Sequence, residues 1–286
     1  MSSRYDTRTT TFSPEGRLYQ VEYASEATRQ AGTVIGVRTA EGIALVAERM
    51  LQNELFDDEN PQNRDISGEK VFRIDDHLGC SVAGVTSDAY ALINQARLTA
   101  QRHFYTFHEP MAAEDLCRAI CDEKQLYTQY GGVRPFGVSF LIVGWDRYHG
   151  YQLYSTEPSG DYGAWLACAI GQSDKVAQAM LKKDWKTGMT LTEGILLGLR
   201  VISKNMDNVK LSMERVEVAV LRKVPAPTEQ RLLNPYIEHV SMVPNFHIMT
   251  SDELKPLLAE AERQRAAEEA AEDERQRQQE AALESA

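Results

Sequence analysis

The order of the sequence elements predicts an α+β fold with four layers, an α-β-β-α sandwich. Along the 286-residue chain, a group of strand-like segments is followed by a group of helix-like segments, and this order occurs twice. Strands that follow strands, instead of alternating one by one with helices, favour antiparallel sheets with helices segregated on the outside. Two sheets packed face to face, each covered by a pair of helices, would bury the apolar side of every element.

The first group consists of short apolar strands and two amphipathic helices. We expect its strands at 33–37, 42–47, 71–74 and 79–83, with a polar surface loop at 51–68. The first helix should begin at a cap formed by Thr86 or Ser87, because apolar residues recur at helical spacing after it. The second helix should end at the glycine pair Gly131-Gly132.

The second group repeats this order and predicts the other half of the sandwich. We expect strands at 138–144, 150–154 and 165–170, helices at 173–185 and 190–206, and a last strand at 216–221. The two ends of the chain differ in composition from this middle part. We therefore divide the chain into a mobile tail at 1–12, the sandwich at 13–224 with an N-terminal helix at 18–31, and a C-terminal extension at 225–286.

The C-terminal extension has a proline-rich part and then a charged, helix-favouring part. The segment Thr250-Ser251-Asp252-Glu253 resembles a capping box and predicts a helix start. Pro256 leaves a later start open, because proline disturbs a helix interior. From residue 260 onward Glu, Ala, Gln and Arg dominate, which predicts a solvated helix or a frayed tail.

Composition excludes several classes of function. The net charge of −11 argues against a nucleic-acid partner, which normally meets a basic face. No apolar run reaches the roughly 18 residues of a membrane span, and the first residues lack the apolar stretch of a secretory signal. The four cysteines and six histidines show no metal-ligand spacing, so we expect buried thiols in a reducing compartment, and no metal.

Residues 31–70 resemble the catalytic segment of N-terminal-nucleophile hydrolases. In these enzymes a threonine hydroxyl attacks a carbonyl carbon, its own free amine acts as base, and an acid and a lysine assist. Glu48 and Lys70 match the acid and the lysine, but the nucleophile position falls on Gly32, which has no reactive side chain. The resemblance thus implies that Gly32, Glu48 and Lys70 are the relic of a catalytic site. The alternative is an active threonine peptidase processed at Thr33, one residue later.

Two longer motifs resemble the α subunits of proteasomes. One runs from Tyr5 to Ala24 and the other from Tyr127 to Ser139, and the whole resemblance covers about residues 4–224. It implies a non-catalytic subunit of a seven-membered outer ring, with no cofactor, in the cytoplasm and nucleus. The implied partners are other α subunits, the β ring, regulatory particles including ATPase caps, and unfolded protein substrates in transit, with neither nucleic acid nor membrane among them.

The resemblance also implies a gate cluster, which holds the N-terminal tail across the pore or away from it. Its members are Tyr5, Asp6, Pro14 and Tyr23. Many α subunits have arginine after the Tyr-Asp pair, whereas Thr7 stands here, which leaves the usual open-state contact in question. From the residues alone, Ser13-Pro14-Glu15-Gly16 predicts a type I turn. The alternative for Tyr23 is an ordinary buried aromatic residue of the helix.

A second implied site is an activator-docking pocket between neighbouring subunits. Lys70, Ala31 and Val85 match its positions, and the lysine would pair with the C-terminal carboxylate of a docking activator. The alternative is that Lys70 forms a structural ion pair, for instance with Glu48. The sequence leaves both interpretations open.

Overall fold

The computed structural model describes residues 10–49, 68–205, 212–226 and 242–266, and within these ranges the chain forms two antiparallel sheets. The first sheet has the strand order β10-β9-β2-β1-β8 and the second the order β3-β4-β5-β6-β7. The strands are β1 Val34–Arg38, β2 Gly42–Glu48, β3 Val71–Asp75, β4 Leu78–Gly84, β5 Val138–Asp146, β6 Gly150–Thr156, β7 Tyr162–Trp165, β8 Ala167–Ile170, β9 Val216–Pro225 and β10 Met242–Ile248.

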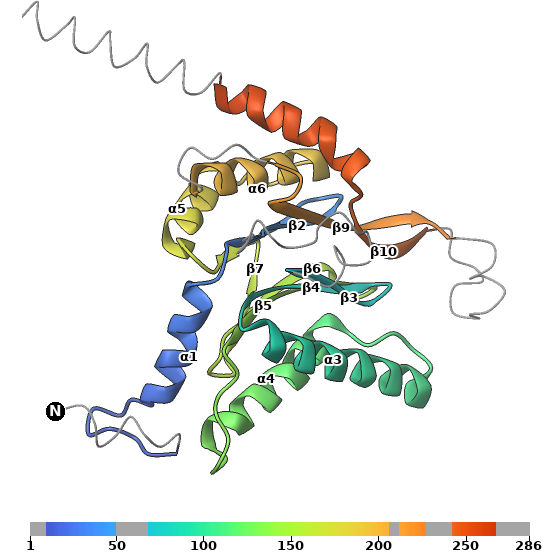
Figure 1. Cartoon of the computed structure of the whole chain (residues 1–286). Helices are drawn as coiled ribbons and strands as arrows, with labels where there is room; N and C mark the ends of the chain where they lie inside the picture. The colour runs from blue at the N-terminus through green and yellow to red at the C-terminus, as the bar shows by residue number, and fades with distance from the viewer. Residues whose placement is uncertain (1–9, 50–67, 206–211, 227–241, 267–286) are drawn as a thin grey trace, which may run out of the picture.

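Helices cover the outer faces of both sheets (Figure 1). They are α1 Tyr19–Arg29, α3 Thr86–Phe107, α4 Ala113–Gln129, α5 Asp174–Asp184 and α6 Leu191–Asn205, and residues 251–266 are also helical. The α5 and α6 helices and the 251–266 helix pack on the first sheet, whereas α3 and α4 pack on the second. The predicted α-β-β-α sandwich is therefore confirmed, and α1 lies beside it, against β4 and β5.

An apolar layer between the two sheets holds the sandwich together. Its fully buried members include Val34, Ile43 and Leu45 from the first sheet and Leu141 and Leu153 from the second. Each such side chain contributes roughly 1.5–3 kcal/mol of transfer free energy when it leaves water. The strands that carry the candidate site, β1, β2 and the start of β3, border this layer, so their backbone positions are fixed by packing on both sides.

Two strand predictions need correction. The segment 165–170 is not one strand: β7 ends at Trp165 in the second sheet, and β8 begins at Ala167 in the first. The apolar run stays continuous while the chain changes sheets, so periodicity alone does not reveal the break. The strand at 216–221 is not the last one, because β10 follows and pairs with β9. Its Pro244 suits the edge position of β10, since an edge strand tolerates the missing N–H group.

Helix starts also differ in part from the prediction. The N-cap of α3 is Val85, with no side-chain cap bond, so the predicted Thr86 or Ser87 cap is wrong. The capping box at 250–253 is confirmed, because the Thr250 N–H donates to Glu253 Oε2 at 2.8 Å and the helix begins at residue 251 rather than at Pro256. Leu254, Leu258 and Ala261 of this helix pack into the layer above the first sheet.

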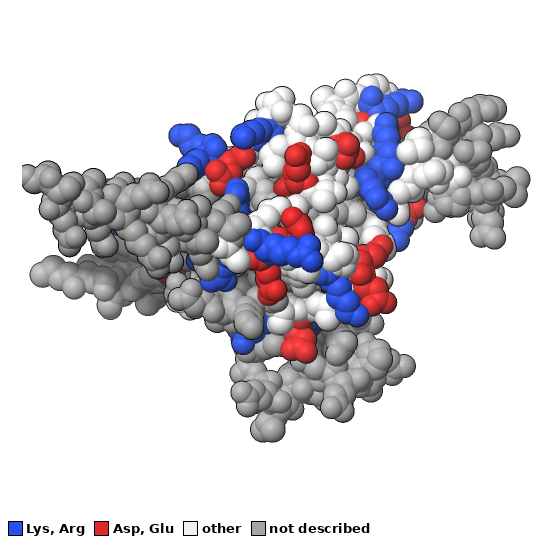
Figure 2. Space-filling model, turned by 90° about the horizontal axis from the view of Figure 1, so that it is seen from above, with Lys and Arg blue, Asp and Glu red and all other residues white. Residues whose placement is uncertain are grey.

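The outer face of the helices on the first sheet carries charges of both signs. Viewed from that side, Lys and Arg side chains lie interspersed with Asp and Glu side chains (Figure 2). This face therefore lacks the concentrated basic field with which proteins bind nucleic acid. Among the helices that the structure describes, none is long and apolar enough to cross a membrane.

Candidate functional site

The residues of the predicted catalytic relic lie together where β1, β2 and β3 meet. Lys70 Nζ donates a hydrogen bond to the Gly32 carbonyl oxygen at 2.7 Å. Glu48 Oε2 accepts the backbone N–H of Thr33 at 3.0 Å, while the Glu48 N–H donates to the Thr33 carbonyl oxygen at 2.8 Å. Antiparallel pairing of β1 with β2 thus places the acid beside the start of β1, and the lysine arrives from the second sheet.

Thr33 has no free reactive group in this arrangement. Its hydroxyl donates to the Gln172 carbonyl oxygen at 2.7 Å, and its side chain is only 1% exposed. Its nitrogen is a peptide amide, and the N–H is bound to Glu48. A threonine nucleophile needs a free amine as its base and access to a substrate carbonyl. Thr33 has neither in the intact chain.

Two further charged residues belong to this cluster, and sequence reasoning missed both. Glu217 Oε2 accepts the backbone N–H groups of Lys70 at 2.9 Å and Val71 at 3.1 Å. Its other carboxylate oxygen lies 3.3 Å from Arg49 Nε. Glu217 stands on β9, far along the sequence, and the available signal was an acid inside the apolar run Val216–Val220.

The charges of this cluster affect the pKa of Lys70. Burial lowers the pKa of its ammonium to about 8, while the nearby carboxylates of Glu48 and Glu217 act in the opposite direction. Burial raises the pKa of Glu217, which the Lys70 N–H and the Arg49 charge oppose. At neutral pH the half-buried Lys70 is thus mainly cationic. An ammonium has three donors, and the hydrogen bond to Gly32 uses one of them.

The other two predicted docking residues, Ala31 and Val85, lie in segments next to the Lys70 cluster. Ala31 is half-buried and packs against the layer between the sheets, next to Gly32. Val85 is 38% exposed and lies three residues beyond Val82, whose N–H donates to the Lys70 carbonyl oxygen. Glu48 and Lys70 direct their hydrogen bonds to different backbone groups, and Glu48 acts on the Lys70 pKa through its charge.

Of the predicted gate cluster, Pro14 and Tyr23 lie in the described residues, whereas Tyr5, Asp6 and the departure at Thr7 lie outside them. The predicted turn is present, because the Gly16 N–H donates to the Ser13 carbonyl oxygen at 2.8 Å and Gly16 has φ of +78°. Tyr23 is 50% exposed on α1 and stacks on Tyr19 with ring centroids 6.4 Å apart. The alternative of a buried helix aromatic is therefore wrong for this chain.

Comparison with known proteins gives two family matches. Residues 28–221 match the family model described as proteasome subunit, and residues 5–27 match the N-terminal signature of A-type proteasome subunits. The chain belongs to the proteasome subunit family. The N-terminal match places it among the α-type members, which are non-catalytic.

Relatives of this proteasome chain agree on its branch. Proteasome subunit alpha type-4-1 of Oryza sativa subsp. indica is 50% identical over 229 residues, which are 80% of this chain and 89% of the relative. Proteasome subunit alpha type-4-A of Arabidopsis thaliana is 49% identical over 228 residues, with the same coverages of 80% and 89%. The type-4 branch is also the one that the Arg8–Thr10 run and the Pro158–Gly163 loop of the sequence resemble.

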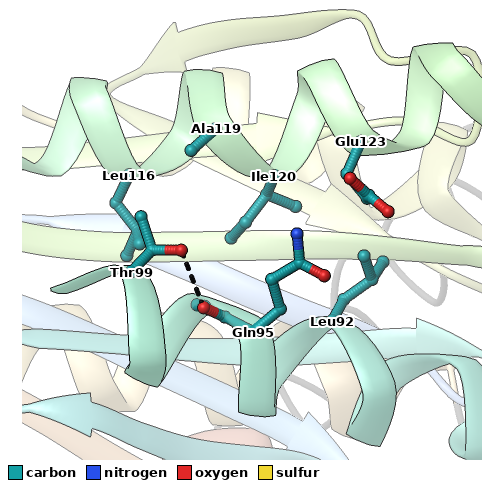
Figure 3. Close-up of a pocket in the computed structure, with 8 residues that line it drawn as sticks. Leu92, Gln95, Thr99, Leu116, Ala119, Ile120 and Glu123 are labelled. Carbon is teal, nitrogen blue, oxygen red and sulfur yellow. Dashed lines mark hydrogen bonds between the residues drawn. The ribbon is translucent and has the colours of Figure 1, made fainter. Parts of the chain in front are cut away.

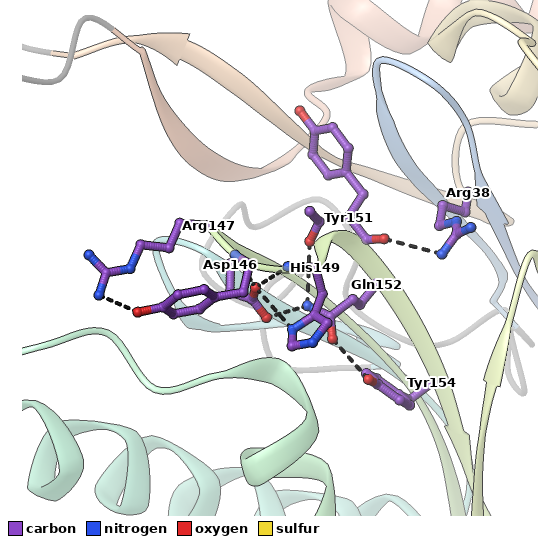
Figure 4. Close-up of polar contacts among 9 residues, drawn as sticks. Arg38, Asp146, Arg147, His149, Tyr151, Gln152 and Tyr154 are labelled. Atoms are coloured by element: carbon purple, nitrogen blue, oxygen red, sulfur yellow. Dashed lines mark hydrogen bonds and ion pairs between the residues drawn. The ribbon is translucent and has the colours of Figure 1, made fainter.

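A second polar cluster of this proteasome chain lies at the β5–β6 turn (Figure 4) and has a structural explanation. The Asp146 carboxylate accepts the backbone N–H groups of Tyr148 at 2.8 Å and His149 at 2.6 Å, and it also accepts a side-chain hydrogen bond from Gln152. The Asp146–His149 pair has the composition of an acid–base dyad, and His149 Nδ1 lies 3.4 Å from Asp146 Oδ1. Its acid is occupied by the N–H groups of its own turn, as in an Asx turn.

The cavity between helices α3 and α4 is too small for a small-molecule ligand. A cavity of about 30 Å³ lies between α3 and α4, lined by Leu92, Leu116 and Ile120 among others (Figure 3). That volume suits about one water molecule. All four cysteines are free and buried, as the sequence predicts. No cluster of three or more His, Cys, Asp or Glu side chains in the described part of the chain is arranged to hold a metal ion.

A second buried lysine, Lys124, lies on α4 under the second sheet. It is fully buried, and its Nζ donates to the Val138 carbonyl oxygen at 2.9 Å and to Thr156 Oγ1 at 2.7 Å. The Phe140 ring lies 4.7 Å from the same nitrogen. Burial lowers the pKa of Lys124 to about 7. Sequence reasoning missed this residue, because one lysine on an amphipathic helix ordinarily faces solvent.

Proposed function

We propose that this chain helps to control access to the proteolytic chamber from its place in the outer α ring, and that it docks regulatory particles. One observation carries the proposal: the turn at 13–16 and helix α1 precede β1 as folded parts of the intact chain. They leave Gly32 and Thr33 inside the chain, at the position where an active subunit of this fold would begin with a free threonine amine. The segment that excludes catalysis is therefore available to control access to catalysis elsewhere.

The absence of catalysis is assigned to Gly32. In this proposal Gly32 occupies the nucleophile position, and Glu48 and Lys70 remain from the ancestral acid and lysine. Two contacts support this assignment: Lys70 binds the Gly32 carbonyl, and Glu48 binds the Thr33 N–H. Both side chains are thus hydrogen-bonded to backbone groups. The rival is processing at Thr33. Intact-mass measurement of the subunit from assembled particles should show a chain that retains its first 32 residues, and their loss would overturn the proposal.

The gating role is assigned to the N-terminal tail together with Tyr5, Asp6, Pro14 and Tyr23. The exposure of Tyr23 and the turn around Pro14 support it, because both present a surface that a neighbouring subunit can contact. Deletion of residues 2–10 should raise the basal peptide hydrolysis of the assembled particle by at least about twofold, since a population of closed pores is lost. Unchanged hydrolysis would remove this tail from the gate. Deletion of 267–286 serves as the control, for which we expect no change.

The docking role is assigned to Lys70 with Ala31 and Val85. A half-buried ammonium with donors left over suits the capture of a terminal carboxylate. The partners in this proposal are neighbouring α subunits, the β ring and regulatory particles including ATPase caps, with unfolded substrates passing through the pore. The location is the cytoplasm and nucleus, which imaging of a tagged, assembled subunit would test.

A further inference from the structure

The loop between α4 and β5, residues 130–137, is the seat of helix α1, meaning the surface on which this helix rests. One ion pair holds that loop in place. Arg134 donates two hydrogen bonds to the Asp88 carboxylate, at 2.6 and 2.8 Å. Asp88 stands in the first turn of α3 and is only 8% exposed. Two parallel bonds between a guanidinium and a carboxylate define an orientation as well as a distance. The pair therefore holds the 130–137 loop against the start of α3.

The same carboxylate also fixes the end of this loop. Asp88 Oδ2 accepts the Gly137 N–H at 3.0 Å, and the Gly137 carbonyl oxygen accepts the Val85 N–H at 2.8 Å. Gly84 also packs closely against Gly137, because a Cβ atom on Gly84 would lie 2.1 Å from the Gly137 carbonyl oxygen. Gly84 has φ of +132°, a conformation that other residues rarely adopt. The junction therefore has little freedom to adjust.

Helix α1, which packs against β4 and β5, lies close to this junction. A Cβ atom at position 137 would lie 3.1 Å from Val85 Cγ2 and 3.9 Å from Ala27 Cβ of α1. Phe136, in the same loop, packs on Tyr127 of α4 with ring centroids 4.5 Å apart. Position 137 is thus enclosed by α1, the start of α3 and the end of the loop. A shift of the loop would change the surface on which α1 rests.

Arg134 and Asp88 interact as a charged pair, with the Asp88 carboxylate ionised. Burial alone would raise the pKa of Asp88, but the hydrogen bonds from Arg134 and from the Gly137 N–H lower the pKa below its usual value. The Arg134 side chain is 65% exposed, whereas the Asp88 side chain is 10% exposed. Removing Arg134 thus leaves a mostly buried carboxylate with one backbone donor, at the point that supports α1.

We propose that Arg134 and Asp88 are positioning residues for the gate: they fix the 130–137 loop as the seat of α1, and thereby set the position of the turn at 13–16 that precedes α1. This inference rests on the proposed gating role. It adds that the gate depends on the Arg134–Asp88 pair, a clamp that lies outside the gate cluster. Val85, assigned to the docking pocket, contacts the same seat, so docking and gating would share one support.

The experiment uses assembled core particles in which this subunit carries Arg134→Ala. Amide hydrogen exchange of residues 19–29 reports the position of α1, and hydrolysis of a small peptide reports the gate. Loss of a bidentate charged pair with one exposed partner should speed α1 exchange and raise basal hydrolysis by about two- to tenfold. In particles that also lack residues 2–10, Arg134→Ala should add no further hydrolysis, because the gate is already lost.

The matched control is Arg200→Ala. Arg200 bonds Asp184 at 2.6 Å between α6 and α5, on the opposite side of the sandwich from α1's seat. It should lower thermal stability without changing α1 exchange or hydrolysis. Equal effects of the two variants would reduce Arg134 to a general stability residue and overturn the proposal. An additive rise of hydrolysis in the tail-deleted particle would overturn it as well.

The outcomes separate this inference from the gating role itself. Unchanged α1 exchange in Arg134→Ala, with a tail deletion that still opens the pore, would overturn the clamp and leave the gate standing. A tail deletion without effect would overturn the gate, and the role of the clamp in gating with it. If the alanine variant does not assemble, Arg134→Lys keeps the charge but loses the two-bond geometry. It should then show the same changes at smaller size, and wild-type values for Arg134→Lys would overturn the proposal.

Discussion

Lys70 and Lys124 are both held inside the sandwich, and burial lowers the pKa of both, to about 8 and about 7. Their surroundings differ. Lys70 lies half-buried at the border of the layer between the sheets, where Glu48 and Glu217 favour its charged form. Lys124 is fully buried between α4 and the second sheet, and its two hydrogen bonds go to a carbonyl and a hydroxyl oxygen.

This difference separates a lysine that can bind from one that supports the fold. Lys124 directs two donors to Val138 and Thr156 and lies 4.7 Å from the Phe140 ring, so all its interactions are internal. Lys70 uses one donor on the Gly32 carbonyl oxygen, while nearby negative charge keeps it mainly cationic at neutral pH. Burial of a lysine is therefore weak evidence of function, and its acceptors and exposure decide the assignment.

The largest expected effect is the loss of Lys124. Lys124→Ala should destabilise the subunit by about 3–5 kcal/mol, because it leaves a cavity in the core and removes the donor from two buried acceptors. We expect a strong fall in the yield of assembled particles, measured by native electrophoresis after co-expression of the subunits. Lys255→Ala is the control, since Lys255 is exposed and pairs with Asp252, one turn earlier in the same helix. Normal assembly of Lys124→Ala would contradict the structural role.

Most of the fold could be predicted because hydrophobic patterning determines it. The alternating and helical patterns gave the two groups of elements, and the packing of apolar faces gave four layers. The split of 165–170 into β7 and β8 could not be predicted, because the side-chain pattern is the same whichever sheet supplies the hydrogen-bond partner. Strand β10 was missed because Pro244 and the prolines before it suggested a loop, although an edge strand accepts Pro244.

The candidate site could be predicted only in part, for a similar reason. Gly32, Glu48 and Lys70 lie within one segment, and a known spacing relates them. Glu217 belongs to the same cluster, but it comes from β9 and joins only when the sheets pack. Likewise, the Arg134–Asp88 pair depends on how the 130–137 loop returns to α3. Contacts between distant segments leave little trace in one sequence.

A pH series sharpens the contrast between the two lysines. The pKa of Lys124 is about 7 in the folded chain and near 10.5 when exposed, so above pH 7 the unfolded chain binds more protons. Stability should therefore rise with pH through this window. Relative to Lys124→Met, which does not titrate, the wild type should gain about 1–2 kcal/mol between pH 7 and 8.5. Thermal unfolding of assembled particles at each pH measures this difference.

The pH series stops at pH 8.5 because a buried thiol changes the stability in the opposite direction at higher pH. Burial raises the pKa of the Cys80 thiol to about 12 from a usual value near 9, so above pH 9 this thiol contributes the opposite slope. The groups whose charges act on Lys124 are Cys121, Cys117, Glu157 and Cys80. A parallel pH dependence of wild type and Lys124→Met would show that Lys124 is not the titrating group.

The smallest expected effect on the fold, with the most specific effect on function, is that of Lys70→Ala. It removes one hydrogen bond from a half-buried site, so particles should assemble at near-normal yield. It should weaken binding of an activator with free C-terminal carboxylates by about tenfold, since one charge-assisted contact is lost. Competition with a synthetic activator C-terminal peptide measures the contact, and the amidated peptide is its control. If Lys70 binds the carboxylate, Lys70→Ala will affect the free-acid peptide and leave the amide unchanged. Equal loss for both peptides would instead assign Lys70 to the shape of the pocket, and unchanged affinity for both would make it, like Lys124, a lysine that only supports the fold.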